Sequence, residues 1–126
     1  METNKGRALV VDDEEMIRSM LTDVLEAFGY EVDAAESGEA ALAHFVAGRY
    51  RVVLTDLLMP GMSGLDVVTE LRRVEPALPA ILLTGLGNAS TAANARQEGV
   101  LVLYKPVSLD KLMAALETTT AGPVGA

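Results

Sequence analysis

Residues 51–64 read RVVLTDLLMPGMSG and contain a strand, an acid and a loop, in that order. The apolar run 52–54, which is rich in β-branched valine, is typical of a strand that is covered on both faces. Asp56 stands where this strand ends, and Pro60, Gly61 and Gly64 interrupt any regular structure beyond it. An aspartate at such a place often does no more than start a turn. A strand that carries one acid to a loop at the rim of a sheet is also a common way to build a site.

The composition limits the classes of protein to which this chain can belong. Its 126 residues fit one compact domain, and half of them are hydrophobic, so the chain can form a sizeable core. Cysteine is absent, which excludes disulfides, thiolate catalysis and cysteine-based zinc sites. The 18 acidic residues against 10 basic ones give a net charge of −8. This balance argues against direct binding to nucleic acid or anionic lipid and suits a cation or a basic partner.

The sequence carries no sign of export or membrane insertion. No apolar run approaches the ~18 residues that a membrane-spanning helix needs. The first residues, METNKGR, lack the apolar centre of a signal peptide. We therefore expect a cytoplasmic protein.

Apolar spacing predicts strands and helices in regular alternation. Strands are expected at 7–11, 30–35, 51–55, 80–83 and 100–104, and helices at 14–28, 39–46, 65–74, 88–98 and 109–117, the last capped by Ser108. The segment 88–98 has only alanines as apolar residues, so we expect it to be weakly anchored. Such alternation predicts an α/β fold with a parallel sheet between helices. One domain is expected over residues 1–118, followed at 119–126 by a tail or the start of a linker.

Polar side chains follow four of the predicted strands. Asp12 and Asp13 follow the first strand, Asp56 the third, Thr84 the fourth and Lys105 the fifth. Each has an ordinary explanation when taken alone, as a helix cap, a turn or an exposed strand end. In a parallel sheet, however, the carboxyl ends of the strands share one edge, and ligands bind there. The joint arrangement therefore predicts that these side chains form one site.

The chemistry expected of this site follows from its residue types. Carboxylates about 4 Å apart repel each other by ~1 kcal/mol in water and ~4 kcal/mol near a protein surface, so a cluster of three needs a cation. An all-oxygen site suits a hard divalent ion, Mg²⁺ above all. Lys105 supplies a positive charge for Asp56 or for a bound phosphate, and Thr84 supplies a hydroxyl donor. These are the parts that phosphoryl transfer to an aspartate requires.

The motifs LVVDDEE, LTDLLMPGMSGL, ILLTG and LYKP resemble, in order and separation, those of receiver domains in the response regulators of two-component signalling. The resemblance covers roughly residues 6–118. It implies a flavodoxin-like (βα)5 fold, a three-layer sandwich whose parallel five-stranded sheet has the order 2-1-3-4-5. It also implies that the chain is no enzyme apart from catalysing its own phosphorylation and dephosphorylation.

The resemblance assigns roles to individual residues. Asp56 would be the phosphoacceptor. Asp13 and Asp56 would bind Mg²⁺ directly and Asp12 through water, while the backbone carbonyl of Leu58 would be a further ligand. Thr84 would contact the phosphoryl group and report its arrival.

The resemblance also gives Lys105 a role and names partners. Lys105 would contact the phosphoryl group together with Thr84, and the Lys105–Pro106 peptide bond would be cis. The donor would be a histidine kinase or a histidine phosphotransfer domain. An output domain or a kinase domain could stand in the same chain, and the oligomeric state stays open.

The chain departs from the family pattern at two places. Val102 stands where the family usually has the aromatic residue of the switch, and Tyr104 lies on the same side of that strand. Leu58 and Leu86, two residues after Asp56 and Thr84, are apolar where the family's side chains flank the path of attacking water. The second departure predicts slow loss of the phosphoryl group.

Two other functions stay open. A phosphatase with an aspartyl-phosphate intermediate would use a similar sheet, but such enzymes generally carry a second aspartate where this chain has Leu58. The other is an interaction module that no longer accepts phosphate, which a failure to bind Mg²⁺ would favour.

Overall fold

The chain folds into five strand–helix repeats, as the apolar spacing predicts. The computed structural model describes residues 5–85 and 89–120. The strands are β1 (Arg7–Val11), β2 (Glu31–Ala35), β3 (Val52–Asp56), β4 (Ala80–Thr84) and β5 (Leu101–Tyr104). The helices are α1 (Glu15–Ala27), α2 (Gly38–His44), α3 (Gly64–Val74), α4 (Ala89–Gln97) and α5 (Leu109–Thr120).

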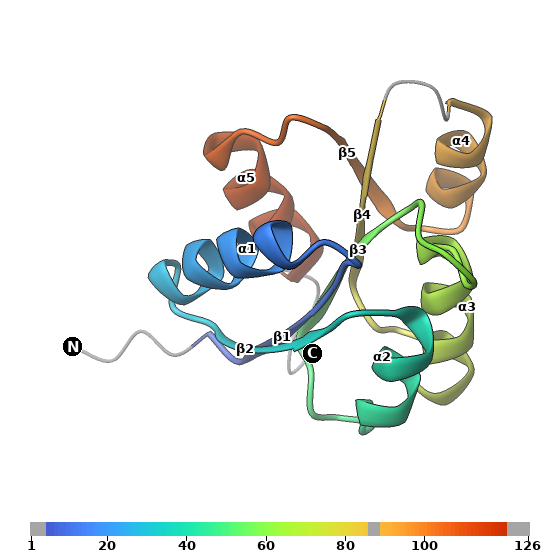
Figure 1. The fold of residues 1–126 in the computed structure, drawn as a ribbon, viewed down its shortest axis with the longest axis horizontal. Helices are drawn as coiled ribbons and strands as arrows, with labels where there is room; N and C mark the ends of the chain where they lie inside the picture. The colour runs from blue at the N-terminus through green and yellow to red at the C-terminus, as the bar shows by residue number, and fades with distance from the viewer. Residues whose placement is uncertain (1–4, 86–88, 121–126) are drawn as a thin grey trace.

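All five strands are parallel and lie in the order β2-β1-β3-β4-β5. Every residue of β3 and β4 is buried, which explains why these strands are nearly continuous apolar runs in the sequence. Helices α1 and α5 cover one face of the sheet, and α2, α3 and α4 cover the other (Figure 1). The expected three-layer sandwich and its strand order are therefore confirmed.

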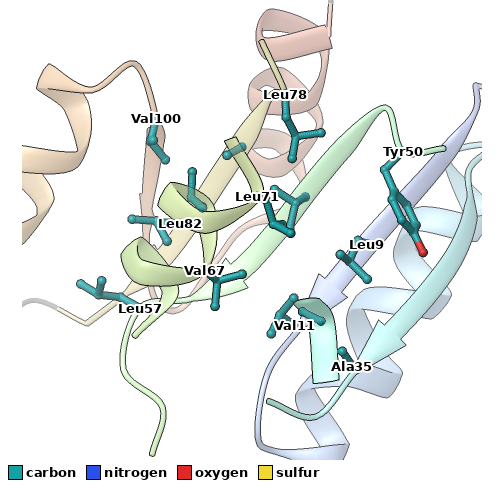
Figure 2. Close-up of a cluster of buried hydrophobic side chains, with 14 of the residues drawn as sticks. Leu9, Val11, Ala35, Tyr50, Leu57, Val67, Leu71, Leu78, Leu82 and Val100 are labelled. Atoms are coloured by element: carbon teal, nitrogen blue, oxygen red, sulfur yellow. The ribbon is translucent and has the colours of Figure 1, made fainter. Parts of the chain in front are cut away.

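The core consists of two clusters, one on each face of the sheet. Side chains of neighbouring strand residues point to opposite faces, so Leu9 and Val11 join the cluster under α2 and α3, while Ala8 and Val10 join the cluster under α1 and α5. Figure 2 shows the first of these clusters, in which Leu9 and Val11 lie among side chains from other strands and from α3. The two clusters fix the strand ends, which carry the predicted site.

Helix α5 is longer than expected, because it runs to Thr120 and not only to residue 117. The Thr120 hydroxyl donates to the carbonyl of Leu116 at 2.6 Å, and the Arg51 guanidinium donates to the carbonyl of Thr120 at 3.0 Å. These polar contacts stabilise the last turn of α5, which lies beyond the apolar residues that predict the helix. Residues 121–126 lie outside the described part of the chain.

Helix α4 has little apolar anchoring, as expected. Within its described side chains, only Ala92 and Ala95 are buried. Arg72 of α3 adds a polar attachment that the sequence does not reveal, since its guanidinium donates to the carbonyl of Leu78 at 3.0 and 2.9 Å and to that of Glu98 at 2.8 Å. Arg72 therefore connects α3 to the segment that precedes β4 and to the end of α4.

Among residues 5–85 and 89–120, none of the helices combines the length and the apolar character that crossing a membrane requires.

Candidate functional site

The predicted site residues meet at the carboxyl edge of the sheet. Asp12 and Asp13 follow β1 directly, and Asp56 is the last residue of β3. Carboxylate oxygens of these three residues lie within 4.8 Å of one another. Lys105, which follows β5, places its Nζ 3.1 Å from Oδ1 of Asp56. The convergence of strand ends that the sequence predicts is thus present in the structure.

Asp12 is the most deeply buried member of the cluster, with no exposed surface. Its Oδ1 accepts a hydrogen bond from the Glu14 backbone N–H at 2.8 Å, whereas its buried Oδ2 has no hydrogen-bond partner among the described residues. Burial raises the pKa of Asp12 above its usual value against the opposing effect of the Glu14 hydrogen bond, and the charge of Asp56 raises it further. An unsatisfied buried carboxylate oxygen beside two other carboxylates is what a hard cation with oxygen ligands would satisfy.

Contacts with Thr55 and Gly64 restrict the backbone of Asp56. It is only 8% exposed, and its backbone oxygen accepts a hydrogen bond from the Thr55 hydroxyl at 3.0 Å. Gly64, the first residue of α3, lies so close to this backbone oxygen that a Cβ at residue 64 would collide with it. The carboxylate of Asp56 therefore projects from a backbone segment that has little room to move.

The loop after Asp56 closes on itself. The Gly64 N–H donates to the carbonyl of Leu57, and the Leu57 N–H donates to the carbonyl of Leu83, both at 2.8 Å. Ser63 and Asp66 form a capping box that starts α3 immediately after the loop. The side chain of Leu58 is 61% exposed. Leu58 thus lies two residues after Asp56 with its apolar side chain largely exposed to solvent.

Thr84 and Lys105 are joined through the backbone. The Lys105 N–H donates to the carbonyl of Thr84 at 2.8 Å, which fixes the end of β5 against the end of β4. Asp56 pairs in register with Leu83, so Thr84 lies one residue farther toward the site edge. The Thr84 hydroxyl donates to the carbonyl of Gly85 at 3.2 Å. The Lys105–Pro106 peptide bond is cis, as predicted.

Tyr104, two residues after Val102 on β5, contacts α4. Its hydroxyl accepts a hydrogen bond from the Arg96 guanidinium at 2.9 Å, and the Arg96 Cζ lies 5.6 Å from the ring centroid. Val102, on the same side of β5, packs partly buried against the cluster under α3. Tyr104 thus links β5 to α4, whereas the sequence indicated only the side of the strand on which it lies.

Two features of the site were not predicted from the sequence. Arg18 of α1 donates to the backbone carbonyl of Asp12 at 2.8 Å. Gly64 is needed for its close approach to Asp56, although in the sequence it indicates only the end of a loop. The side chain of Leu86, which was expected to flank the site, lies outside the described residues.

Comparison with known proteins gives one consistent family. The model of the response regulator receiver domain matches residues 8–117. The chain is 38% identical over 98 residues to the transcriptional regulatory protein ResD of Bacillus subtilis, covering 78% of this chain and 40% of that protein. It spans only part of the length of these curated relatives, between 40 and 53% for three of them and about a quarter for the transcriptional regulatory protein ZraR and the regulatory protein AtoC of Escherichia coli.

Solved structures agree with this result. A response regulator receiver domain protein from Clostridium thermocellum has a TM-score of 0.88 and 34% identity, covering 92% of this chain and 94% of that one. The response regulator protein TrrA from Thermotoga maritima, in complex with Mg²⁺-BeF, has a TM-score of 0.80 and 37% identity, covering 90% of this chain and 98% of that one.

Proposed function

Because the chain belongs to the family of response regulator receiver domains of two-component signalling, we propose that it accepts a phosphoryl group on Asp56. One observation carries this proposal. Asp56 lies in a cluster of carboxylates within 4.8 Å of one another, and the Lys105 ammonium lies 3.1 Å from its Oδ1. Asp56 is thus a nucleophilic carboxylate, and the Lys105 ammonium beside it can also pair with the phosphoryl group after transfer.

The proposed donor is a phosphohistidine of a histidine kinase or of a phosphotransfer domain. An oxygen of Asp56 forms a bond to phosphorus, while the phosphorus–nitrogen bond of the donor breaks. The donor imidazole leaves with the electron pair of that bond and takes up a proton. The product is an acyl phosphate on Asp56, and the chain acts only on itself.

The residues present fit a Mg²⁺ ion. Asp13 and Asp56 would hold it directly and Asp12 through water, and the backbone carbonyl of Leu58 would add a further oxygen. The buried, unpartnered Oδ2 of Asp12 supports this assignment. A bound Mg²⁺ would offset the negative charges of the carboxylates and of the phosphoryl group.

After transfer, the phosphoryl charge would rearrange the neighbouring side chains. Lys105 would pair with phosphoryl oxygens, and the Thr84 hydroxyl would turn from the carbonyl of Gly85 toward the new acceptor. Helix α4 would follow, because its described side chains bury only two alanines. The face formed by α4, β5 and α5 would then select a partner, which could be an output or kinase domain of the same chain.

Labelling of the wild-type protein tests the proposal. Incubation with acetyl phosphate and Mg²⁺ is expected to add one phosphoryl group, which mass spectrometry of peptides locates at Asp56. A chelator added beforehand should prevent the labelling, since the carboxylate cluster would keep its repulsion without the ion. Labelling at another residue, or labelling that is insensitive to the chelator, would contradict the proposal.

The two other functions gain no support from the site. A phosphatase of the aspartyl-phosphate type would need an acid two residues after Asp56, where the Leu58 side chain has no proton to give. A module that does not accept phosphate would have no need for a carboxylate cluster with an unpartnered buried oxygen. Absence of Mg²⁺ binding would restore this second possibility.

Leu58 is expected to slow the hydrolysis of the acyl phosphate. Its exposed apolar side chain offers no hydrogen bond to an attacking water, so Leu58→Asn should speed the decay of phospho-Asp56. The expected gain is about 3- to 10-fold, below the ~100-fold or more that a positioned acid or base supplies. Val74→Asn, at a similarly exposed residue of α3, is the control and should leave the decay unchanged. A decay rate in Leu58→Asn equal to that of the wild type would show that Leu58 does not shield the site.

A further inference from the structure

The acidic segment after β1 is held by an arginine of α1. Arg18 lies in the first turns of this helix, and its Nη1 donates to the backbone oxygen of Asp12 at 2.8 Å. That oxygen belongs to the peptide group between Asp12 and Asp13, so the contact fixes the orientation of the peptide plane that leads to Asp13. The Arg18 side chain is partly buried, which limits the positions that its guanidinium can adopt.

Other contacts fix the same segment from other directions. The Asp12 N–H donates to the carbonyl of Ala35 at 3.1 Å, and Oδ1 of Asp12 accepts from the Glu14 N–H at 2.8 Å. The Glu14 side chain, at the N-cap of α1, makes no capping hydrogen bond of its own. The Arg18 contact therefore restrains the backbone carbonyl of Asp12, which lies one residue beyond the end of β1 at Val11.

The Asp12–Asp13 segment needs a restraining contact because its carboxylates repel each other and the carboxylate of Asp56. Asp12, Asp13 and Asp56 have carboxylate oxygens within 4.8 Å of one another, and repulsion at such distances is ~4 kcal/mol per pair near a protein surface. Asp13 is exposed and free to turn away unless its backbone is fixed. A planar guanidinium on a backbone carbonyl gives a more defined geometry than a flexible ammonium does.

We propose that Arg18 is a positioning residue of this site, which holds the Asp12–Asp13 peptide so that both carboxylates face Asp56. The proposal rests on the phosphoacceptor function given above. It differs from a simple effect of charge in the sign of the expected result. Removal of a nearby positive charge would strengthen the binding of a cation, whereas loss of a positioning contact weakens it.

Titration calorimetry with Mg²⁺ alone, without any phosphodonor, tests the proposal. Arg18→Gln is expected to weaken Mg²⁺ binding about 10-fold, at the lower end of what loss of a supporting contact costs a metal site. Arg18→Lys keeps the charge and a donor and should recover part of the loss. Arg18→Met, which keeps the aliphatic stem, serves as the neutral variant if Arg18→Gln does not fold.

Arg51→Gln is the matched control. Arg51 also donates to a backbone carbonyl, that of Thr120 at 3.0 Å, but it directly precedes β3 at the opposite edge of the sheet. Its replacement should leave Mg²⁺ binding unchanged. Unchanged or tighter Mg²⁺ binding in the folded neutral variants of Arg18 would overturn the positioning role. A wild-type protein that binds no Mg²⁺ and takes no label would instead overturn the proposed function itself.

Discussion

Asp56→Asn is expected to abolish labelling by acetyl phosphate or by a histidine kinase. The amide has no anionic oxygen to attack phosphorus, and no other carboxylate of the cluster stands beside Lys105 in the same way, since the 3.1 Å ion pair is made by Asp56. The expected loss is complete within the sensitivity of radiolabelling or of intact-protein mass spectrometry, at saturating Mg²⁺ and donor.

The fold should survive this substitution, so that loss of labelling reports on chemistry. Removal of one carboxylate relieves repulsion within the cluster, which offsets the loss of the ion pair between Asp56 and Lys105. Thermal unfolding in the absence of Mg²⁺ should therefore change little. Asp23→Asn, at an exposed residue of α1, is the control and should be labelled as the wild type is. Labelling of Asp56→Asn at another residue would refute Asp56 as the acceptor.

The fold could be predicted from the sequence because its strands are buried on both faces. Residues 52–54 and 80–83 are uninterrupted apolar runs, and burial of all of β3 and β4 is the cause of that pattern. The ends of the helices were less predictable. Helix α5 continues to Thr120 through hydrogen bonds of the Thr120 hydroxyl and of Arg51, which apolar spacing cannot reveal.

The site could be predicted for a topological reason. In a parallel sheet each strand delivers its next residue to the same edge, so Asp12, Asp56 and Lys105 meet although they are far apart in the sequence. Supporting residues do not follow this rule. Arg18 and Arg72 reach backbone carbonyls outside their own helices through long side chains, and apolar spacing does not specify those acceptors.

Gly64 illustrates a different limit of the sequence. Beside Pro60 and Gly61, the sequence indicates only a turn residue, and the backbone of Gly64 does not adopt a positive φ. The requirement for glycine is steric and arises from β3, because the space that a Cβ would need is taken by the backbone of Asp56 and by a Leu82 methyl group at 2.9 Å. A contact between elements decides this residue, not the conformation of the loop.

Gly64→Ala is therefore expected to destabilise the protein and to impair the site at the same time. An alanine near the start of a helix gains ~0.4–1 kcal/mol by restricting the unfolded chain. The collision with the carbonyl of Asp56 cannot be relieved by a side-chain rotation, so the cost of overpacking, about 3 kcal/mol, exceeds that gain. Chemical denaturation should show this loss. Because either α3 or the end of β3 must shift, labelling of Asp56 should also be slower in the folded variant.

Gly85→Ala is the matched control for this steric argument. Gly85 also borders the site, but within the described part of the chain no atom lies within 4 Å of a Cβ built at this residue, and its φ is not positive. Its replacement should not lower the free energy of unfolding, and the restriction of the unfolded chain alone should raise it by at most about 1 kcal/mol. If Gly64→Ala proves as stable as Gly85→Ala, the segment between Asp56 and α3 can adjust without cost. The inference that packing of α3 on β3 holds Asp56 rigidly would then be wrong.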